Sequence, residues 1–275
     1  MTPIITLTTD FGTKDYFVGA LKGIIYSELP NAKIVDLSHK ITPFSVNEAA
    51  YVIRNAYRHF PKGSIHIIAV DSEQTIENKH IALLLDGHYF ICADNGVVSL
   101  IRANFNPDKV VEIYLPNSKT DYFLSNFVQV ACHIARGGSL QVIGMDIIDI
   151  KSIKEVQPHI NTERNQIIGH IIYIDNYGNA ITNIDKAIFN KIGKGRKFEI
   201  KTRFYTFETI FSTYSDVVNF DIPIEKRNYD GKKMILFNSD DFLEVALYRS
   251  NNDTVGGASS MLSLGYRDTV TINFL

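Results

Sequence analysis

The chain has 275 residues, of which 45% are hydrophobic and 21% are charged, and its formal net charge is −2. This length is sufficient for one large domain or two smaller ones, each with its own core. A nearly neutral chain without a basic cluster does not attract phosphates or anionic lipids. We therefore expect neither a nucleic acid nor a membrane surface as its partner.

The two cysteines, Cys92 and Cys132, lie in apolar surroundings, and no CxxC motif is present. We therefore expect buried thiols and no structural zinc or other metal site. The start of the chain lacks the basic region of a signal peptide, and no run of about 18 apolar residues could span a membrane. These features predict a cytoplasmic protein.

The first half of the chain alternates between strand and helix patterns. Ser45 followed by Glu48 predicts a helix start, and "DG" at residues 86–87 predicts a tight hairpin turn. The predicted strands are 4–9, 33–37, 64–70, 80–85, 88–92 and 109–114, and the predicted helices are 15–28, 46–60 and 124–135. This alternation predicts an α/β fold with a mostly parallel sheet, in an N-terminal domain of residues 1–153.

The pattern changes in the second half of the chain. The polar stretch 154–165 predicts a linker to a C-terminal domain of residues 166–275. The predicted strands there are 167–174, 180–183, 197–201, 206–211, 233–237, 243–247 and 269–274. Strands with so few helical patterns between them predict a small antiparallel β-barrel or sandwich.

Two aspartates directly follow predicted strands of the first domain. Asp10 ends "LTTD" and Asp71 ends "IIAVD", so we expect their loops to open on the same edge of the sheet, where α/β proteins bind ligands. Either aspartate alone could be a turn former or a helix cap. No GxGxxG follows the first strand and no P-loop exists, which argues against a phosphate cradle. Acids without such a cradle suit a ligand with hydroxyls and positive charge.

The second domain contributes the motif "IDNYGNAITNI". It carries Asp175, Tyr177 and Asn179 around Gly178, and a glycine in this context predicts a bulge or a close backbone approach. An acid, an aromatic ring and an amide together can hold an amino-acid head group and stack on a planar ring. The same residues also fit a hairpin with an Asx turn, and the pattern alone does not decide between these interpretations.

Six short motifs occur in one order along nearly the whole chain. They are "TDFGTKDYFVGALKGII", "ITPFSVNEAAYVI", "ADNGVVSLI", "ACHIARG", "IDNYGNAITNI" and "NSDDFLEVAL". The ordered set resembles the S-adenosylmethionine-dependent hydroxide adenosyltransferases, which are related to fluorinases and chlorinases. The resemblance implies an α/β N-terminal domain, a C-terminal β-barrel and a homotrimer with active sites between neighbouring subunits.

The resemblance also implies roles for individual residues. Asp10 would accept the ribose hydroxyls of S-adenosylmethionine, Asp15 would meet the methionine ammonium, and Phe44 would form an aromatic wall. The residues expected to contact the methionine part and the adenine from the neighbouring subunit are Asp175, Tyr177, Asn179 and Ser239. S-adenosylmethionine is then a substrate, and no cofactor is expected.

The nucleophile pocket departs from the family pattern. The family's hydrolases hold the attacking water with an Asp, an Arg and a His. Asp71 matches the Asp, but Asn78 stands at the Arg position and Tyr122 at the His position. Lys79 could supply the lost charge through a one-residue shift, and the Tyr122 hydroxyl can still form hydrogen bonds. We therefore take Asp71, Asn78, Lys79 and Tyr122 as the candidate catalytic residues.

Two functions of different classes fit these residues. The first is hydrolysis of S-adenosylmethionine to adenosine and L-methionine. The second is binding of S-adenosylmethionine or adenosine with little or no turnover, because two of the three water-holding positions are changed. Halogenation is disfavoured because the halogenating relatives carry an extra loop where this chain has Asp86–Gly87. Methyl transfer is disfavoured because no glycine-rich loop follows the first strand.

Overall fold

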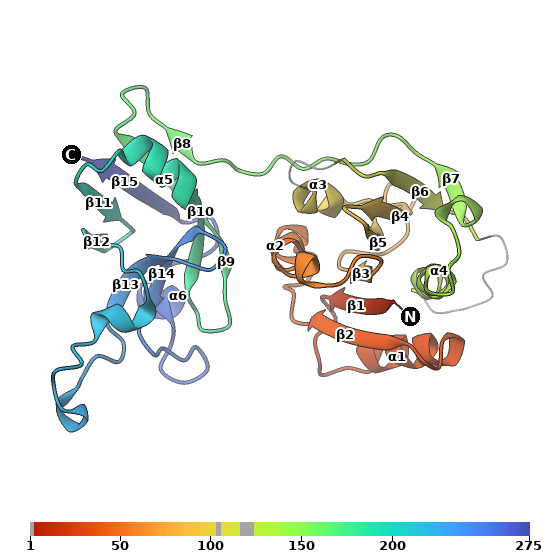
Figure 1. The fold of residues 1–275 in the computed structure, drawn as a ribbon, viewed down its shortest axis with the longest axis horizontal. Helices are drawn as coiled ribbons and strands as arrows, with labels where there is room; N and C mark the ends of the chain where they lie inside the picture. Colours follow the sequence, from red (N-terminus) through yellow and green to blue (C-terminus); the bar gives the residue numbers. More distant parts are fainter. Residues whose placement is uncertain (1–2, 103–105, 116–123) are drawn as a thin grey trace. The chain divides into compact units, whose positions relative to one another are not determined.

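The computed structural model describes residues 3–102, 106–115 and 124–275. The chain forms two compact units, Met1–Glu155 and Val156–Leu275, each with its own sheet and core (Figure 1). No helix in these described ranges is long and apolar enough to cross a membrane.

The first unit is built on a seven-stranded sheet, counted over the described residues, in the order β2-β1-β3-β5-β4-β6-β7. The four strands β2, β1, β3 and β5 run parallel, and β4, β6 and β7 complete the sheet with antiparallel pairings. The bounds of the strands are β1 (Ile4–Thr9), β2 (Lys33–Ser38), β3 (Ile65–Ala69), β4 (His80–Leu85), β5 (His88–Ala93), β6 (Lys109–Ile113) and β7 (Gly144–Asp146). The predicted α/β fold with a largely parallel sheet is confirmed.

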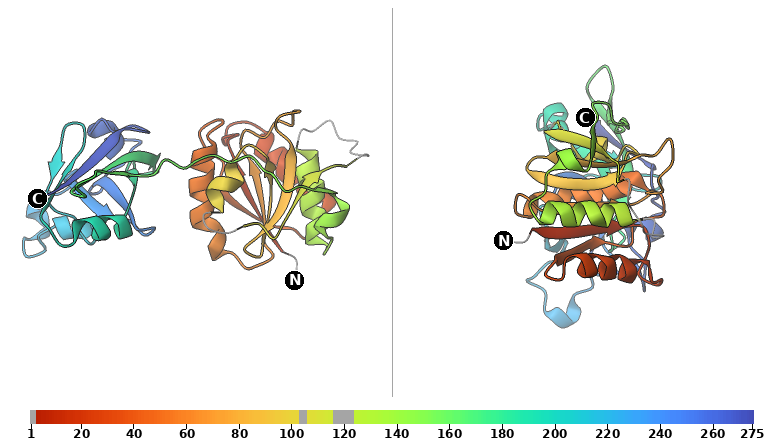
Figure 2. Two further views of the ribbon diagram at one scale, coloured as in Figure 1. Left: turned by 90° about the horizontal axis from the view of Figure 1, so that it is seen from above. Right: turned by 90° about the vertical axis from the view of Figure 1, so that its right-hand side faces the viewer.

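Helices cover both faces of this sheet (Figure 2). α1 (Phe17–Glu28) and α4 (Ser125–Ala135) share one apolar core with the sheet, and α2 (Val46–Ala56) and α3 (Val97–Ile101) share the other. The 3₁₀ turns of this unit are Tyr57–His59 and Leu140–Val142. Covering helices leave ligand access at the ends of the strands, which is where the candidate residues of this unit lie.

Most local sequence patterns of the first unit predicted its helix starts and turns correctly. The Ser45 side chain accepts a hydrogen bond from the Glu48 N–H, as predicted. Asp86 and Gly87 both have positive φ, at 49° and 72°, as a two-residue hairpin turn of this type requires. Some details differ from the prediction: α1 begins at Phe17 rather than at Asp15, the helix expected over 46–60 ends as an α-helix at Ala56, and α3 and β7 were not predicted. α3 has only five residues, too few to show a helical period.

The second unit is a strongly curved antiparallel sheet in the order β12-β11-β15-β9-β10-β14-β13, with β8 pairing β9. Beyond β12, Phe211 forms a bridge to Leu236 of β13, which brings the two edges of the sheet together. The bounds of the strands are β8 (His159–Ile160), β9 (Gln166–Ile174), β10 (Ala180–Asp185), β11 (Phe198–Lys201), β12 (Thr206–Phe207), β13 (Lys233–Phe237), β14 (Phe242–Leu247) and β15 (Thr269–Phe274). The predicted antiparallel, barrel-like second fold is confirmed.

Three details of the second unit differ from the prediction. The segment 154–165, expected as a linker, contains β8, because the Asn161 side chain accepts the N–H groups of Asn165 and Gln166 and closes a turn. The strand expected at 206–211 ends at Phe207. The helices α5 (Lys186–Gly193) and α6 (Ala258–Met261) and the 3₁₀ turns Tyr214–Val217 and Ile224–Lys226 were not predicted.

Candidate active site

The parallel strands of the first unit bring three predicted residues together. Asp10 directly follows β1, Asp71 lies two residues after β3, and Phe44 lies between β2 and α2. The backbone N–H groups of Phe44 and Asp71 both donate to Oδ2 of Asp10, at 2.9 and 3.4 Å. The prediction that the loops of Asp10 and Asp71 open on one edge of the sheet is therefore confirmed.

Both donor residues have a left-handed backbone, with φ of 65° at Phe44 and 45° at Asp71. A residue with a side chain rarely adopts this conformation, and it persists only where the surroundings hold it. Here the Asp10 carboxylate does so, since it accepts both N–H groups. No described residue donates to the other oxygen, Oδ1, which leaves it available to a ligand hydroxyl.

Asp71 is held by its backbone alone. Its carbonyl oxygen accepts hydrogen bonds from Nδ2 of Asn78 and Nδ2 of Asn95, both at 3.1 Å, and its N–H donates to Asp10. Within the described part of the chain, no group donates a hydrogen bond to the Asp71 carboxylate. The backbone of Asp71 is therefore fixed while its carboxylate is uncommitted.

The other candidate catalytic residues differ in placement. The neutral amide of Asn78 donates to the backbone carbonyls of Asp71 and Glu73, at 3.1 and 3.0 Å, and thereby closes the loop. The Lys79 ammonium forms an ion pair of 2.7 Å with Glu112. Tyr122 lies outside the described residues, so its role stays a prediction.

Asp15 and Phe44 are both accessible at this edge of the first unit. Asp15 is exposed in the bend that precedes α1, and Phe44 is 74% exposed. Sequence reasoning missed Asn95, whose amide binds the carbonyls of Val70 and Asp71. The signal was present, since Asn95 lies in the quoted motif "ADNGVVSLI", two residues after β5.

In the second unit, Asp175 organises a tight turn. Its Oδ1 accepts the N–H groups of Tyr177 and Asn179, at 2.9 and 2.8 Å, and its Oδ2 accepts Nδ2 of Asn179 at 3.0 Å. A Cβ on Gly178, where φ is 80°, would lie 2.7 Å from Cα of Gly257. The predicted close backbone approach is confirmed, and the Asx turn forms as well.

This turn forms one wall of a cavity of about 380 Å³, a size typical of small-molecule sites. Asn179 is 4% exposed, and its Oδ1 has no hydrogen-bond partner among the described residues. The cavity is lined by Asp175, Tyr177, Asn179, Tyr214, Leu247, Tyr248, Arg249 and Ser250. A ligand with a donor group would satisfy the unpaired oxygen of Asn179.

Ser239 does not lie in this group. It occupies the turn before β14, whereas the cavity is lined by residues at the far end of that strand, among them Ser250. The β10–β14 pairing explains the separation: Ala180, next to Asn179, faces Val245 near the end of β14, while Asp185 faces Phe242 at its start. Ser250 is therefore the serine that the structure brings to Asp175, Tyr177 and Asn179.

Sequence reasoning also missed a hydrogen-bonded pair beside the cavity, of which only the acid is buried. The Tyr214 hydroxyl donates to Oε1 of Glu244 at 2.6 Å, and Glu244 is 2% exposed. Burial raises the pKa of Glu244, and the nearby Asp175 charge adds to this, although the bond from Tyr214 acts in the opposite direction. Burial likewise raises the pKa of Asp175, against the hydrogen bonds it accepts. Both carboxyls would therefore be further stabilised by a cationic ligand.

Across the described ranges, no cluster of three metal-binding side chains exists.

Two family models match the chain. The SAM hydroxide adenosyltransferase N-terminal domain matches residues 5–144, and the SAM hydroxide adenosyltransferase C-terminal domain matches residues 169–271. The chain belongs to the SAM hydroxide adenosyltransferase family. The resemblance inferred from the ordered motifs is confirmed.

Similar proteins match most of the chain. The (R)-S-adenosyl-L-methionine hydrolase of Methanocaldococcus jannaschii is 29% identical over 286 residues, which cover 98% of this chain and 95% of the relative. A fluorinase of Actinoplanes sp. is 24% identical over 279 residues, with coverages of 89% and 90%. The crystal structure of an uncharacterized conserved protein from Thermotoga maritima has a TM-score of 0.82 at 25% identity and covers 98% of this chain and 100% of its own. The SAM hydroxide adenosyltransferase family thus contains proteins named as hydrolases and proteins named as fluorinases.

Proposed function

We propose that this protein hydrolyses S-adenosyl-L-methionine to adenosine and L-methionine. One observation carries the proposal: the Asp71 backbone is fixed through its N–H and its carbonyl, while its carboxylate accepts no hydrogen bond from the described residues. A preorganised and uncommitted carboxylate is what a water-activating group requires. The similarity to relatives named as (R)-S-adenosyl-L-methionine hydrolases supports the same reaction.

The chemistry makes modest demands on the protein. Water attacks the ribose C5′ carbon, a C–O bond forms, and the C5′–S bond breaks with its electron pair going to sulfur. Methionine leaves as a neutral thioether, so no general acid is needed. Asp71 accepts a hydrogen bond from the water, aims it at C5′ and takes its proton.

The remaining candidate residues bind the substrate in this proposal. The carboxylate of Asp10 accepts the ribose hydroxyls, Asp15 pairs with the methionine ammonium, and Phe44 packs against the nucleoside. The second unit contributes its cavity, where the Asn179 oxygen accepts a hydrogen bond from the ligand and Tyr177 stacks on it. No cofactor enters the reaction.

A second function, S-adenosylmethionine binding with little or no turnover, is favoured by a different observation. Among the described residues no lysine or arginine contacts the Asp71 carboxylate, since the Lys79 ammonium is paired with Glu112. A developing hydroxide beside an uncompensated carboxylate is less stabilised than one near a fixed cation. We therefore propose slow hydrolysis rather than turnover typical of a site with a fixed arginine.

Incubation with S-adenosyl-L-methionine followed by chromatography separates the two functions. We expect adenosine and L-methionine to form in equal amounts, in proportion to the protein concentration. Tight binding by calorimetry without adenosine after long incubation would instead establish the binding protein. An absence of both binding and turnover would contradict both functions.

We also propose that the protein is a homotrimer in which the first unit of one copy and the second unit of a neighbour complete each site. Large apolar side chains are exposed near the candidate residues of each unit and support this assembly. Among them are Phe44 and Ile76 in the first unit and Tyr177 and Val255 in the second. Light scattering is expected to give three times the chain mass, and S-adenosylmethionine should raise the melting temperature. A monomer that binds the ligand with full affinity would contradict the assembly.

A further inference from the structure

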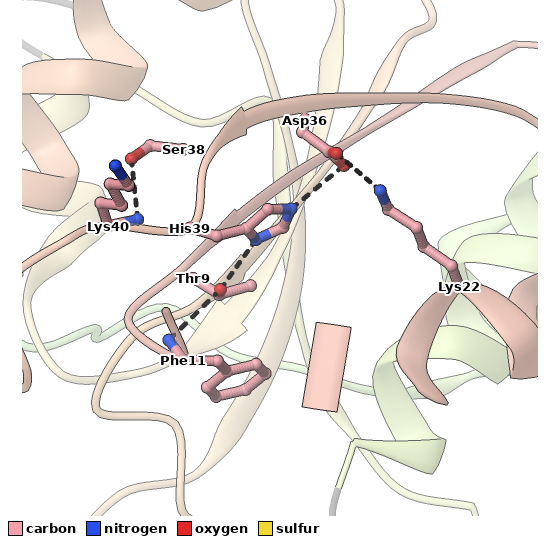
Figure 3. Close-up of polar contacts among 7 residues, drawn as sticks. All are labelled: Thr9, Phe11, Lys22, Asp36, Ser38, His39 and Lys40. Atoms are coloured by element: carbon pink, nitrogen blue, oxygen red, sulfur yellow. Dashed lines mark hydrogen bonds and ion pairs between the residues drawn. The ribbon is translucent and has the colours of Figure 1, made fainter. Parts of the chain in front are cut away.

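A chain of polar side chains links α1, β2 and β1 and ends at Thr9 (Figure 3). The Lys22 ammonium donates to Oδ2 of Asp36 at 2.6 Å, and Oδ1 of Asp36 lies 3.1 Å from Nε2 of His39. On the other side of the ring, Nδ1 of His39 lies 2.9 Å from Oγ1 of Thr9. Thr9 is the residue directly before Asp10, so the chain ends at the candidate ribose-binding loop.

The Asp36 carboxylate is the charged acceptor in this chain of polar side chains. Partial burial acts to raise the pKa of Asp36, but the hydrogen bonds from Lys22 and His39 outweigh it and lower that pKa. Asp36 is therefore an ionised acceptor at neutral pH, and its Oδ1 lies within ion-pair distance of Nε2 of His39. Nδ1 of His39 and the Thr9 hydroxyl share one hydrogen bond, and the hydroxyl oxygen accepts the Phe11 N–H at 3.4 Å.

His39 also holds the far side of the same loop. Its carbonyl oxygen accepts the N–H of Gly12 at 2.7 Å. Its ring and its carbonyl therefore fix the residues on both sides of Asp10, namely Thr9 and Gly12. His39 is 7% exposed and Thr9 is fully buried, so water cannot easily replace these contacts.

We propose that His39 is the positioning residue that aims the Asp10 carboxylate at its ligand, with Asp36 and Lys22 fixing the ring of His39. The proposal rests on the proposed function, in which Asp10 accepts the ribose hydroxyls. Asp10 in turn anchors the N–H groups of Phe44 and Asp71, so a displaced Asp10 also misplaces the loops that carry these residues. His39 acts through Asp10 and does not itself touch the substrate.

The test compares two ligands, adenosine and 2′,3′-dideoxyadenosine, which lacks the 2′ and 3′ hydroxyls of the ribose. Calorimetry on the parent is expected to show adenosine bound at least tenfold more tightly than the dideoxy ligand. His39→Ala should reduce this preference about fivefold or more, by weakening the binding of adenosine more than that of the dideoxy ligand. His39→Asn should recover much of it, because an amide group near the Nδ1 position can still form a hydrogen bond with the Thr9 hydroxyl.

Three further variants complete the design. Asp10→Ala should abolish the preference, and adding His39→Ala to it should change nothing more, as expected for residues that act as one unit. Lys40→Ala, an exposed side chain in the same loop, is the matched control and should keep the parent's preference. Asp36→Asn is partly exposed and should fold, and it is expected to lower the preference two- to threefold.

The outcomes distinguish a failure of the ribose-binding role of Asp10 from a failure of the positioning role of His39. If the parent binds both ligands alike, the ribose role of Asp10 fails and the positioning role fails with it. If the parent discriminates but His39→Ala discriminates equally well, the positioning role alone is wrong. If His39→Ala does not fold, His39→Asn and Asp36→Asn test the proposal instead. The proposal would be overturned if Asp36→Asn kept the parent's preference for adenosine and His39→Asn lost affinity for both ligands equally.

Discussion

Asp71→Asn is expected to lower the single-turnover rate of S-adenosylmethionine hydrolysis by roughly 10²–10⁴-fold, the usual contribution of a general base. The affinity for S-adenosylmethionine should change by no more than about threefold, since Asp10, Asp15 and the second unit are proposed to bind the substrate. The loss is chemical because the substitution removes the carboxylate charge and little else.

Asp71→Asn should leave the conformation of the loop unchanged. The contacts that hold Asp71 are made by its own N–H and carbonyl, which asparagine retains. Its φ of 45° lies in the left-handed region, which asparagine tolerates better than most residues. Glu77→Gln, an exposed acid of the same loop, is the matched control and should hydrolyse at the parent rate. Equal rates in Asp71→Asn and the parent would show that Asp71 does not activate the water.

Asp10→Ala is expected to weaken the binding of adenosine and of S-adenosylmethionine by at least tenfold. A hydrogen bond to a charged acceptor contributes about 1.5–3 kcal/mol, and two ribose hydroxyls would lose this acceptor together. The N–H groups of Phe44 and Asp71 would lose it as well. Turnover of the substrate that still binds should therefore fall too.

Two measurements interpret this loss. Calorimetry gives the affinities, and a melting curve shows whether the variant is folded at the temperature of the assay. Asp149→Ala removes an exposed aspartate of the same unit and should bind like the parent. A folded Asp10→Ala variant with unchanged affinity for both ligands would refute the ribose-binding role.

Much of the framework of the site follows from local sequence signals. The placement of Asp10 and Asp71 at one edge required only that two buried runs form parallel strands, and a strand end is visible in the sequence. The Ser45 cap and the Asp86–Gly87 turn depend on neighbouring residues alone, so they too were predictable. A bulge or a close backbone approach at Gly178 was predictable from the glycine itself, whereas its partner Gly257 was not.

The contacts inside the loops could not be predicted in this way. Asn78 is the residue expected from the resemblance at the position of a cation, and its amide binds backbone carbonyls because the loop from Asp71 to Asn78 folds back on itself. Lys79 was a plausible substitute cation until its pairing with Glu112, across the β4–β6 pairing, was visible. Such partners depend on loop conformation and strand register rather than on residue type.

The second unit shows the same limit. Ser239 and Ser250 lie near opposite ends of β14, and only the pairing with β10 reveals which end faces the cavity. Tyr214 reaches Glu244 from a segment 30 positions earlier, without any pattern that links them. A carboxylate in the middle of the apolar run "LEVAL" was nevertheless a visible sign that a polar partner had to exist.

The most direct test of the central claim is hydrolysis in water labelled with ¹⁸O. The parent is incubated with S-adenosyl-L-methionine, and the products are analysed by mass spectrometry. Attack of water at C5′ predicts adenosine that carries one ¹⁸O in its 5′-hydroxyl and L-methionine that carries none, with both products lost in Asp71→Asn. Adenosine without the label, or no adenosine from a protein that binds the substrate, would contradict the account.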